Sequence, residues 1–190
     1  LQYTIPQGKT VWGFANDDSH ALDDIDVTRD IMLMPELSNE ALRTAMENGT
    51  FFACSRYARY EMGEDFVGEG AYAEIHEVMV DDDNDVISVA ASNYDVIEWI
   101  ADGEIIATGE TLDLREYSDE IGCYVRFQIK NEGGIVCSQP FVCDDGDMSD
   151  DAVEYPEEHV PNNVIAAFLQ ELLDFLRRTL IGEVIYDNFF

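Results

Sequence analysis

The chain has 190 residues and carries 41 acidic side chains against 10 basic ones, which gives a formal net charge of -31 and a pI near 4.1. A hydrophobic fraction of 46% is that of a protein that folds around a core, so we assign the acidity to the surface. Such a surface repels phosphate backbones and anionic lipids, which excludes nucleic acid as a partner and makes a membrane partner unexpected. The sequence shows no secretory signal and no apolar stretch of the ~20 residues that would span a bilayer, so we expect a cytoplasmic protein.

Residues 1–70 show a pattern of strands and one helix. Short apolar runs predict strands over 10–15, 30–34 and 51–54. Between the last two, Ser38 is a typical N-cap and Gly49 a typical stop signal, which predicts a helix between them. This order is typical of an α/β domain.

Residues 71–143 change to successive strands with polar turns, which predicts an antiparallel β-rich module resembling a sandwich. The Ala-Asp-Gly turn at 101–103 predicts a hairpin. In the last long strand, Val125, Phe127 and Ile129 alternate with polar residues and are expected on one face. The predicted strands are rich in β-branched residues and lie at 86–91, 96–100, 104–107, 123–129 and 135–137.

Two further segments complete the predicted organisation. Residues 144–163 are acidic, contain Pro156 and Pro161, and are interpreted as a linker. Residues 164–190 have apolar side chains at helical spacing and are predicted to form an amphipathic helix. That helix could pack on the β module, pair with another helix in self-association, or lie in a membrane interface, although its polar face lacks the lysines usual for the last.

Asp18 and His20 form the cluster with the clearest chemistry. They directly follow the apolar run at 10–15, and a carboxylate and an imidazole two residues apart at a strand end can turn toward one divalent metal ion. The alternative is structural, with Asp18 capping a turn and His20 solvated. We therefore regard Asp18 and His20 as candidate metal ligands.

Several motifs between residues 8 and 143 resemble the end of a PHP (polymerase and histidinol phosphatase) domain and the region that follows it in phosphoesterase-like members of that family. The first is Trp-Gly-Phe-Ala-Asn-Asp-Asp-Ser-His at residues 12–20. The others are Asp-Ile-Met-Leu-Met-Pro-Glu-Leu at 30–37, the helix with its Asn-Gly stop at 41–49, Phe-Phe-Ala at 51–53, the turn from Trp99 to Gly103, Tyr-Val-Arg at 124–126 and Gln-Pro-Phe at 139–141.

The resemblance implies a metal-dependent hydrolase that acts on a small phosphate ester. Asp18 and His20 occupy the positions of metal ligands in the family's last motif, and the ions would be manganese, zinc or iron. On this basis we predict an α+β fold: the C-terminal fragment of a PHP-type α/β barrel in residues 1–70, then the β-rich module, the linker and the amphipathic helix. No catalytic residue besides the metal ligands is assigned.

The family's earlier ligand motifs have no counterpart in this sequence. Its histidines are His20, His76 and His159, and no two of them are close in sequence. We therefore expect that the chain is the C-terminal part of such a phosphoesterase, with an incomplete metal site and no activity in isolation. The alternative is a non-catalytic β-rich binding or assembly module, in which the Asp18 and His20 cluster is structural.

Overall fold

The computed structural model describes residues 1, 4–9, 11–22 and 25–143. The chain divides into two units, Leu1–Val153 and Glu154–Phe190, and all described residues belong to the first. The linker predicted at 144–163 and the amphipathic helix predicted at 164–190 lie outside the described residues.

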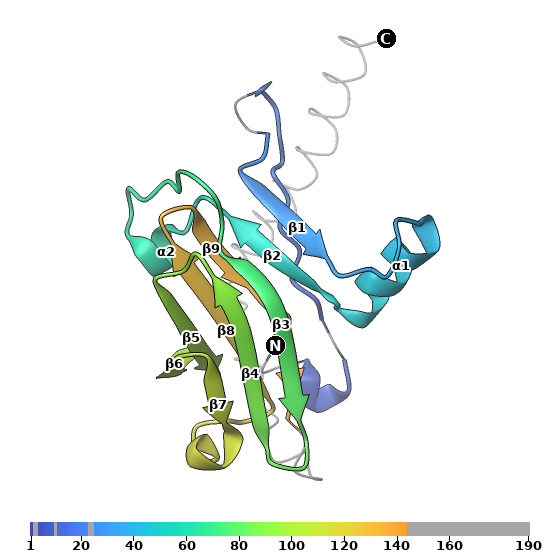
Figure 1. Ribbon diagram of the computed structural model, residues 1–190, viewed down its shortest axis with the longest axis vertical. Helices are drawn as coiled ribbons and strands as arrows, with labels where there is room; N and C mark the ends of the chain where they lie inside the picture. Colours follow the sequence, from blue (N-terminus) through green and yellow to red (C-terminus); the bar gives the residue numbers. More distant parts are fainter. Residues whose placement is uncertain (2–3, 10, 23–24, 144–190) are drawn as a thin grey trace, which may run out of the picture. The chain divides into compact units, whose positions relative to one another are not determined.

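The larger sheet of the described unit has the strand order β1-β2-β9-β8-β5-β6, and β10 pairs with β8 at one end (Figure 1). Every pairing in it is antiparallel. The strands are β1 (Thr28–Met32), β2 (Phe51–Ser55), β5 (Val96–Ala101), β6 (Glu104–Thr108), β8 (Tyr124–Asn131), β9 (Gly134–Cys137) and β10 (Phe141–Val142).

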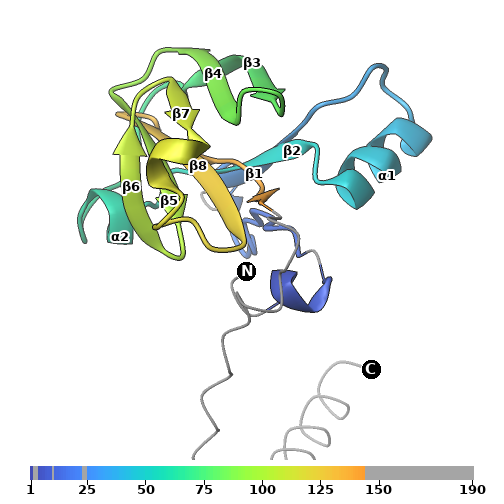
Figure 2. The ribbon, with the colours of Figure 1, turned by 90° about the horizontal axis from the view of Figure 1, so that it is seen from below.

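A second sheet of three antiparallel strands packs against one face of the larger sheet (Figure 2). Its strands, in the order β3-β4-β7, are β3 (Glu74–Asp81), β4 (Val86–Ser92) and β7 (Thr111–Asp113). The main core lies between the sheets because each contributes the side chains of alternate residues to it. The smaller sheet supplies Ile87, Val89 and Leu112, and the larger sheet supplies Phe52, Cys54, Ile97, Trp99, Val125, Phe127, Ile129 and Val136.

The helix predicted between Ser38 and Gly49 is found as α1 (Asn39–Asn48). The Ser38 hydroxyl accepts a hydrogen bond from the backbone of Ala41, and Gly49 ends the helix with φ 67°. Glycine is required there, because a Cβ atom would also lie 2.7 Å from the ring of Trp12. The other α-helix of the described residues is the single turn α2 (Arg59–Met62), and 3-10 turns lie at Ile5–Gln7 and Leu114–Tyr117.

The predicted fragment of an α/β barrel is wrong for the described residues. A barrel of that kind needs parallel strands that alternate with helices packed on them. Here β1 and β2 pair antiparallel although α1 lies between them in sequence, and α1 buries only Ala45. The prediction failed because it used only the order of the elements. A strand followed by a helix and a second strand can pair in parallel or antiparallel. The described unit is mostly antiparallel β-sheet.

The strand predicted over 10–15 is also absent, since the described residues 11–19 carry no helix or strand. This segment instead crosses the face of the larger sheet that points away from the core, as the contacts given below show. Val11 and Phe14 remain about half exposed. The apolar side chains of this segment predicted a buried strand. In the structure the ring of Phe14 instead packs on the outside of the sheet.

Candidate metal-ligating site

The segment that contains Asp18 and His20 is fixed to the outer face of the larger sheet by contacts to β1, to β2 and to Gln139, which follows β9. At the β9 side, Gly13 and the Gln139 side chain exchange two hydrogen bonds, of 2.8 and 2.9 Å. Over β2, the ring of Phe14 stacks on Phe51 with a centroid distance of 4.5 Å. Over β1, the backbone N–H of Ala15 donates to the carboxylate of Asp30 at 2.9 Å. The segment therefore reaches β1 at its outer edge.

Asp17 then closes a loop against the beginning of β1. Its carboxylate accepts hydrogen bonds from the backbone N–H of Asp26, at 2.8 Å, and from both the backbone N–H and the hydroxyl of Thr28. These bonds, above all the one from the Thr28 backbone, lower the pKa of Asp17 below its ordinary value. Asp17 therefore serves as the anchor of the loop, a role that the sequence analysis did not assign to it.

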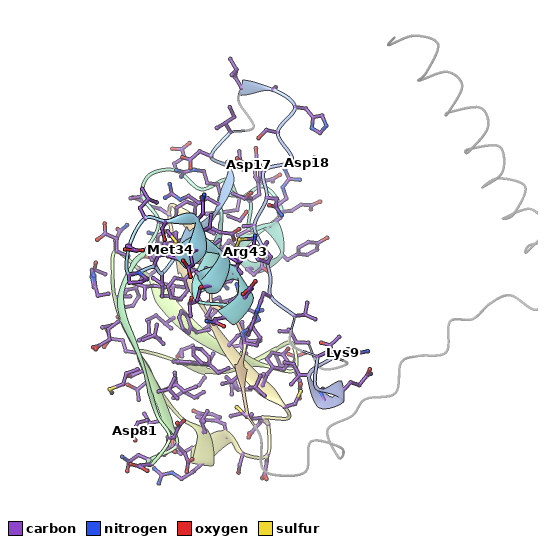
Figure 3. All side chains as sticks on the ribbon, turned by 90° about the vertical axis from the view of Figure 1, so that its right-hand side faces the viewer. Lys9, Asp17, Asp18, Met34, Arg43 and Asp81 are labelled. Carbon is purple, nitrogen blue, oxygen red and sulfur yellow. The ribbon has the colours of Figure 1, made fainter. Side chains whose placement is uncertain are left out.

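Asp18 follows Asp17 in this loop (Figure 3), and Asp18 and His20 are both exposed. Asp18 has φ 50°, in the left-handed region that aspartate tolerates better than most residues. This turn brings the backbone carbonyl of Asp18 to 2.6 Å from Nδ1 of His20. The two residues are thus brought together locally.

The contact with Asp18 defines the tautomer of a neutral His20 ring. A carbonyl oxygen can only accept a hydrogen bond, so Nδ1 must carry the proton and the lone pair of the ring is on Nε2. Histidines that bind metals in proteins usually have this arrangement, in which the second ring nitrogen donates to a backbone carbonyl or a carboxylate. The ring atom of His20 suited to a metal ion is therefore Nε2.

The described residues do not by themselves complete a metal site. A structural or catalytic zinc site has three or four protein ligands, and this loop offers one carboxylate and one imidazole. Within residues 1–143, apart from the few positions left undescribed there, no group of three or more His, Cys, Asp or Glu side chains is arranged to hold a metal ion. The residues fit part of a site only, and no catalytic step through a metal ion follows from them.

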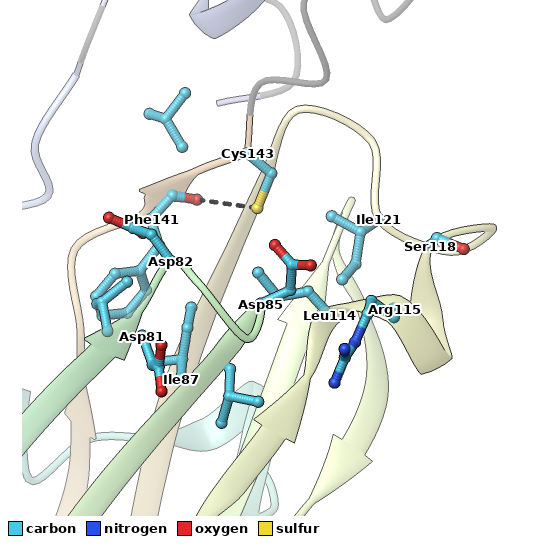
Figure 4. Close-up of a pocket in the computed structure, with 13 residues that line it drawn as sticks. Asp81, Asp82, Asp85, Ile87, Leu114, Arg115, Ser118, Ile121, Phe141 and Cys143 are labelled. Carbon is cyan, nitrogen blue, oxygen red and sulfur yellow. Dashed lines mark hydrogen bonds between the residues drawn. The ribbon is translucent and has the colours of Figure 1, made fainter.

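A cavity of about 580 Å³ lies elsewhere, between the β3–β4 turn and the end of β10 (Figure 4). Asp81, Asp82 and Asp85 line it beside apolar side chains such as Leu114 and Ile121. The cation at its edge, Arg115, is already engaged by the carboxylate of Asp113 in two hydrogen bonds of 3.0 and 2.8 Å. Arg115 is therefore not available to pair with the carboxylates in the cavity, and the lining gives no indication of catalysis.

The outer face of the larger sheet carries buried polar side chains, whose burial the sequence did not predict. The alternation in β8 places Gln128 opposite the core, as expected, and Lys130 lies on the same face, yet they are only 3% and 9% exposed. Lys130 Nζ and Gln128 Nε2 each lie 2.7 Å from a carboxylate oxygen of Glu98, and Lys130 also donates to the backbone carbonyl of Glu61 in α2. No sequence signal shows this, because the covering residues come from distant parts of the chain.

No known protein family matches the chain, and neither a curated protein nor a solved structure matches it. Among the described residues, no helix is long and apolar enough to cross a membrane. A functional proposal therefore depends on the motifs of the sequence and on the local geometry of Asp18 and His20.

Proposed function

We propose that this chain is a portion of a metal-dependent phosphoesterase of PHP type, acting on a small phosphate ester, to which it contributes Asp18 and His20 as two metal ligands. The observation that carries the proposal is the hydrogen bond between Nδ1 of His20 and the carbonyl of Asp18, which leaves the lone pair of the neutral ring on Nε2. The bound ion, manganese, zinc or iron, would supply Lewis acidity at the phosphate.

The loop that carries the two ligands is positioned by residues that do not bind the ion. Asp17 uses its carboxylate for Asp26 and Thr28, so it holds the loop while Asp18 and His20 extend beyond it. Ligands that are positioned by a fixed surrounding shell need less reorganisation when the ion binds. This division of roles among neighbouring residues supports the proposal.

Two ligands give weak binding, so the remaining ligands must come from outside the described residues. We therefore expect the chain alone to lack phosphatase activity. Hydrolysis by the purified chain that disappears in Asp18→Ala would show that the site is complete within the chain, and would contradict this part of the proposal.

The ring nitrogens of His20 allow a direct test by long-range proton–nitrogen NMR on the purified chain. We expect neutral His20 to be protonated at Nδ1, and added zinc to shift Nε2. His76 is an internal control in the same spectrum, since its Nε2 lies 2.8 Å from the Ser92 hydroxyl in β4 and it has no neighbour assigned as a ligand.

The variant Asp18→Asn removes the carboxylate and keeps the backbone carbonyl that orients His20. It should weaken the zinc response of His20 without changing the tautomer. A ring protonated at Nε2, or equal zinc shifts for His20 and His76, would refute the proposal. The alternative would then stand, a non-catalytic binding or assembly module in which both residues are structural.

A further inference from the structure

β1 is an edge strand of the larger sheet, and among the described residues it pairs with no strand other than β2. The backbone N–H of Leu33 donates to Thr50, and the carbonyl of Val27 accepts from Arg56, so odd-numbered residues of this stretch bond to β2. The even-numbered residues therefore direct their backbone groups away from the sheet. On this outer side the N–H of Thr28 is taken by Asp17.

Asp30 and Met32 complete the outer side of β1. Their backbone N–H groups have no hydrogen-bond partner among the described residues. An edge of this kind is a template on which another chain can add a strand. The Asp17 anchor closes the edge at one end, so an added strand would lie along Asp30 and Met32 and continue toward α1.

Apolar side chains accompany the unpaired edge. Ile31 is 37% exposed and Leu33 is 51% exposed. Next to them, a groove of about 390 Å³ runs between residues 33–38 and α1, with the side chains of Leu33, Ala41 and Ala45 in its lining and Glu36 and Glu40 also along it. The continuation of an added strand would thus find a groove whose lining combines apolar residues with hydroxyl side chains and two carboxylates.

The charge of this region indicates what kind of chain fits there. The described residues 17–22 and 25–47 contain seven acidic side chains and two arginines. One of these, Arg29, is already paired with Asp26 at 3.2 Å and lies over the ring of Tyr72. A second copy of the chain is a poor occupant, since each copy carries a net charge of -31 and would repel the other.

We propose that the outer edge of β1 accepts an extended segment of a different polypeptide, with apolar residues alternating with lysine or arginine, as an additional strand. Backbone hydrogen bonds from Asp30 and Met32 would hold the segment. Its basic side chains would meet the acidic surroundings, and its apolar side chains would cover Ile31 and Leu33. The inference is independent of the metal proposal, because it uses neither Asp18 nor His20.

The test uses a fluorescent synthetic peptide of alternating lysine and valine and measures its binding to the whole chain by fluorescence anisotropy. In the protein, Met32→Pro removes the outward N–H without removing a bond to β2, and proline is tolerated at such edge positions. Met32→Ala is the matched control that keeps the N–H. We expect Met32→Pro to weaken binding at least tenfold and Met32→Ala to weaken it much less.

A change in the peptide tests the same bond without altering the protein. Methylation of alternate backbone nitrogens on one edge of the peptide should abolish its binding to the unmodified chain. A peptide of alternating glutamate and valine should bind at least tenfold more weakly than the lysine peptide. The inference is overturned if the lysine peptide does not bind, if Met32→Pro and the methylated peptide both bind normally, or if sedimentation shows that the chain pairs with itself through this edge.

Discussion

Phe127 lies at the centre of the core between the two sheets, and its truncation tests the fold directly. Its side chain is 0% exposed, and its ring is 5.5 Å from that of Trp99 in an edge-to-face arrangement and 6.1 Å from that of Phe52. Removing a fully buried phenylalanine side chain usually costs about 3–5 kcal/mol, which combines lost burial with the cavity left behind. The edge-to-face contact is worth about 0.5–1.5 kcal/mol beyond burial and favours the upper part of that range. We therefore expect Phe127→Ala to lower the free energy of unfolding by about 4 kcal/mol.

The measurement is urea unfolding followed by circular dichroism, with the slope of the transition compared between variants. Tyr60→Ala is the control, because Tyr60 is fully exposed and its loss should change the free energy of unfolding by less than about 0.5 kcal/mol. If Phe127→Ala does not fold, Phe127→Leu retains most of the volume and should give a smaller but measurable loss. A loss below about 1 kcal/mol in Phe127→Ala would refute the placement of this residue between two packed sheets.

Three further predictions concern individual contacts. Asp17→Asn should lower the melting temperature at neutral pH. Because the pKa of Asp17 is lowered in the folded state, the difference from the unmodified chain should shrink as the pH falls below the ordinary value of 3.8 and vanish once the pH lies below the lowered pKa; a difference that persists there would contradict the anchor role. Lys130→Met should cost about 3 kcal/mol in urea unfolding, because it leaves the Glu98 carboxylate, which is only 13% exposed, without its cation. The double variant Glu98→Leu with Lys130→Met should cost clearly less, and equal costs would count against the ion pair. Gly133→Ala should lower the urea midpoint, since the added Cβ would collide with the backbone oxygen of Ala71. Gly13→Ala is the control and should leave the midpoint nearly unchanged, because only the Gln139 side chain lies nearby, at 4.0 Å. A larger loss in Gly13→Ala than in Gly133→Ala would refute the close approach of Gly133 to Ala71.

The local predictions that succeeded depend on short-range physical chemistry. The limits of α1 follow from a hydroxyl at Ser38 and a glycine at Gly49, and both act within one turn of the helix. The strands predicted at 86–91, 96–100 and 104–107 are found as β4, β5 and β6, because β-branched runs separated by turn residues favour extended pairs. The contact of the His20 ring with the backbone carbonyl of Asp18 is equally local, since only Ser19 separates the two residues, and their role as metal ligands stays a prediction.

The failures concern everything that depends on which segments meet in space. The predicted barrel fragment was wrong because the direction in which β1 and β2 pair is not encoded in the order of a strand, a helix and a strand. The strand predicted at 10–15 was wrong because the apolar side chains of that segment lie on the outside of a sheet, not within one. Gln128 was expected on the polar face of its strand, and the sequence could not show that Glu98, from another strand, helps to bury it.

The sequence by itself determined the limits of α1 and most strand positions, because each of these depends on neighbours within a few residues. Tertiary structure alone decided the antiparallel order of the strands, the anchor formed by Asp17 and the unpaired edge of β1. These features require contacts between segments far apart in the chain, such as Gly13 with Gln139 and Lys130 with α2. Such contacts are selected by the packing of the whole unit, which no local pattern of residues records.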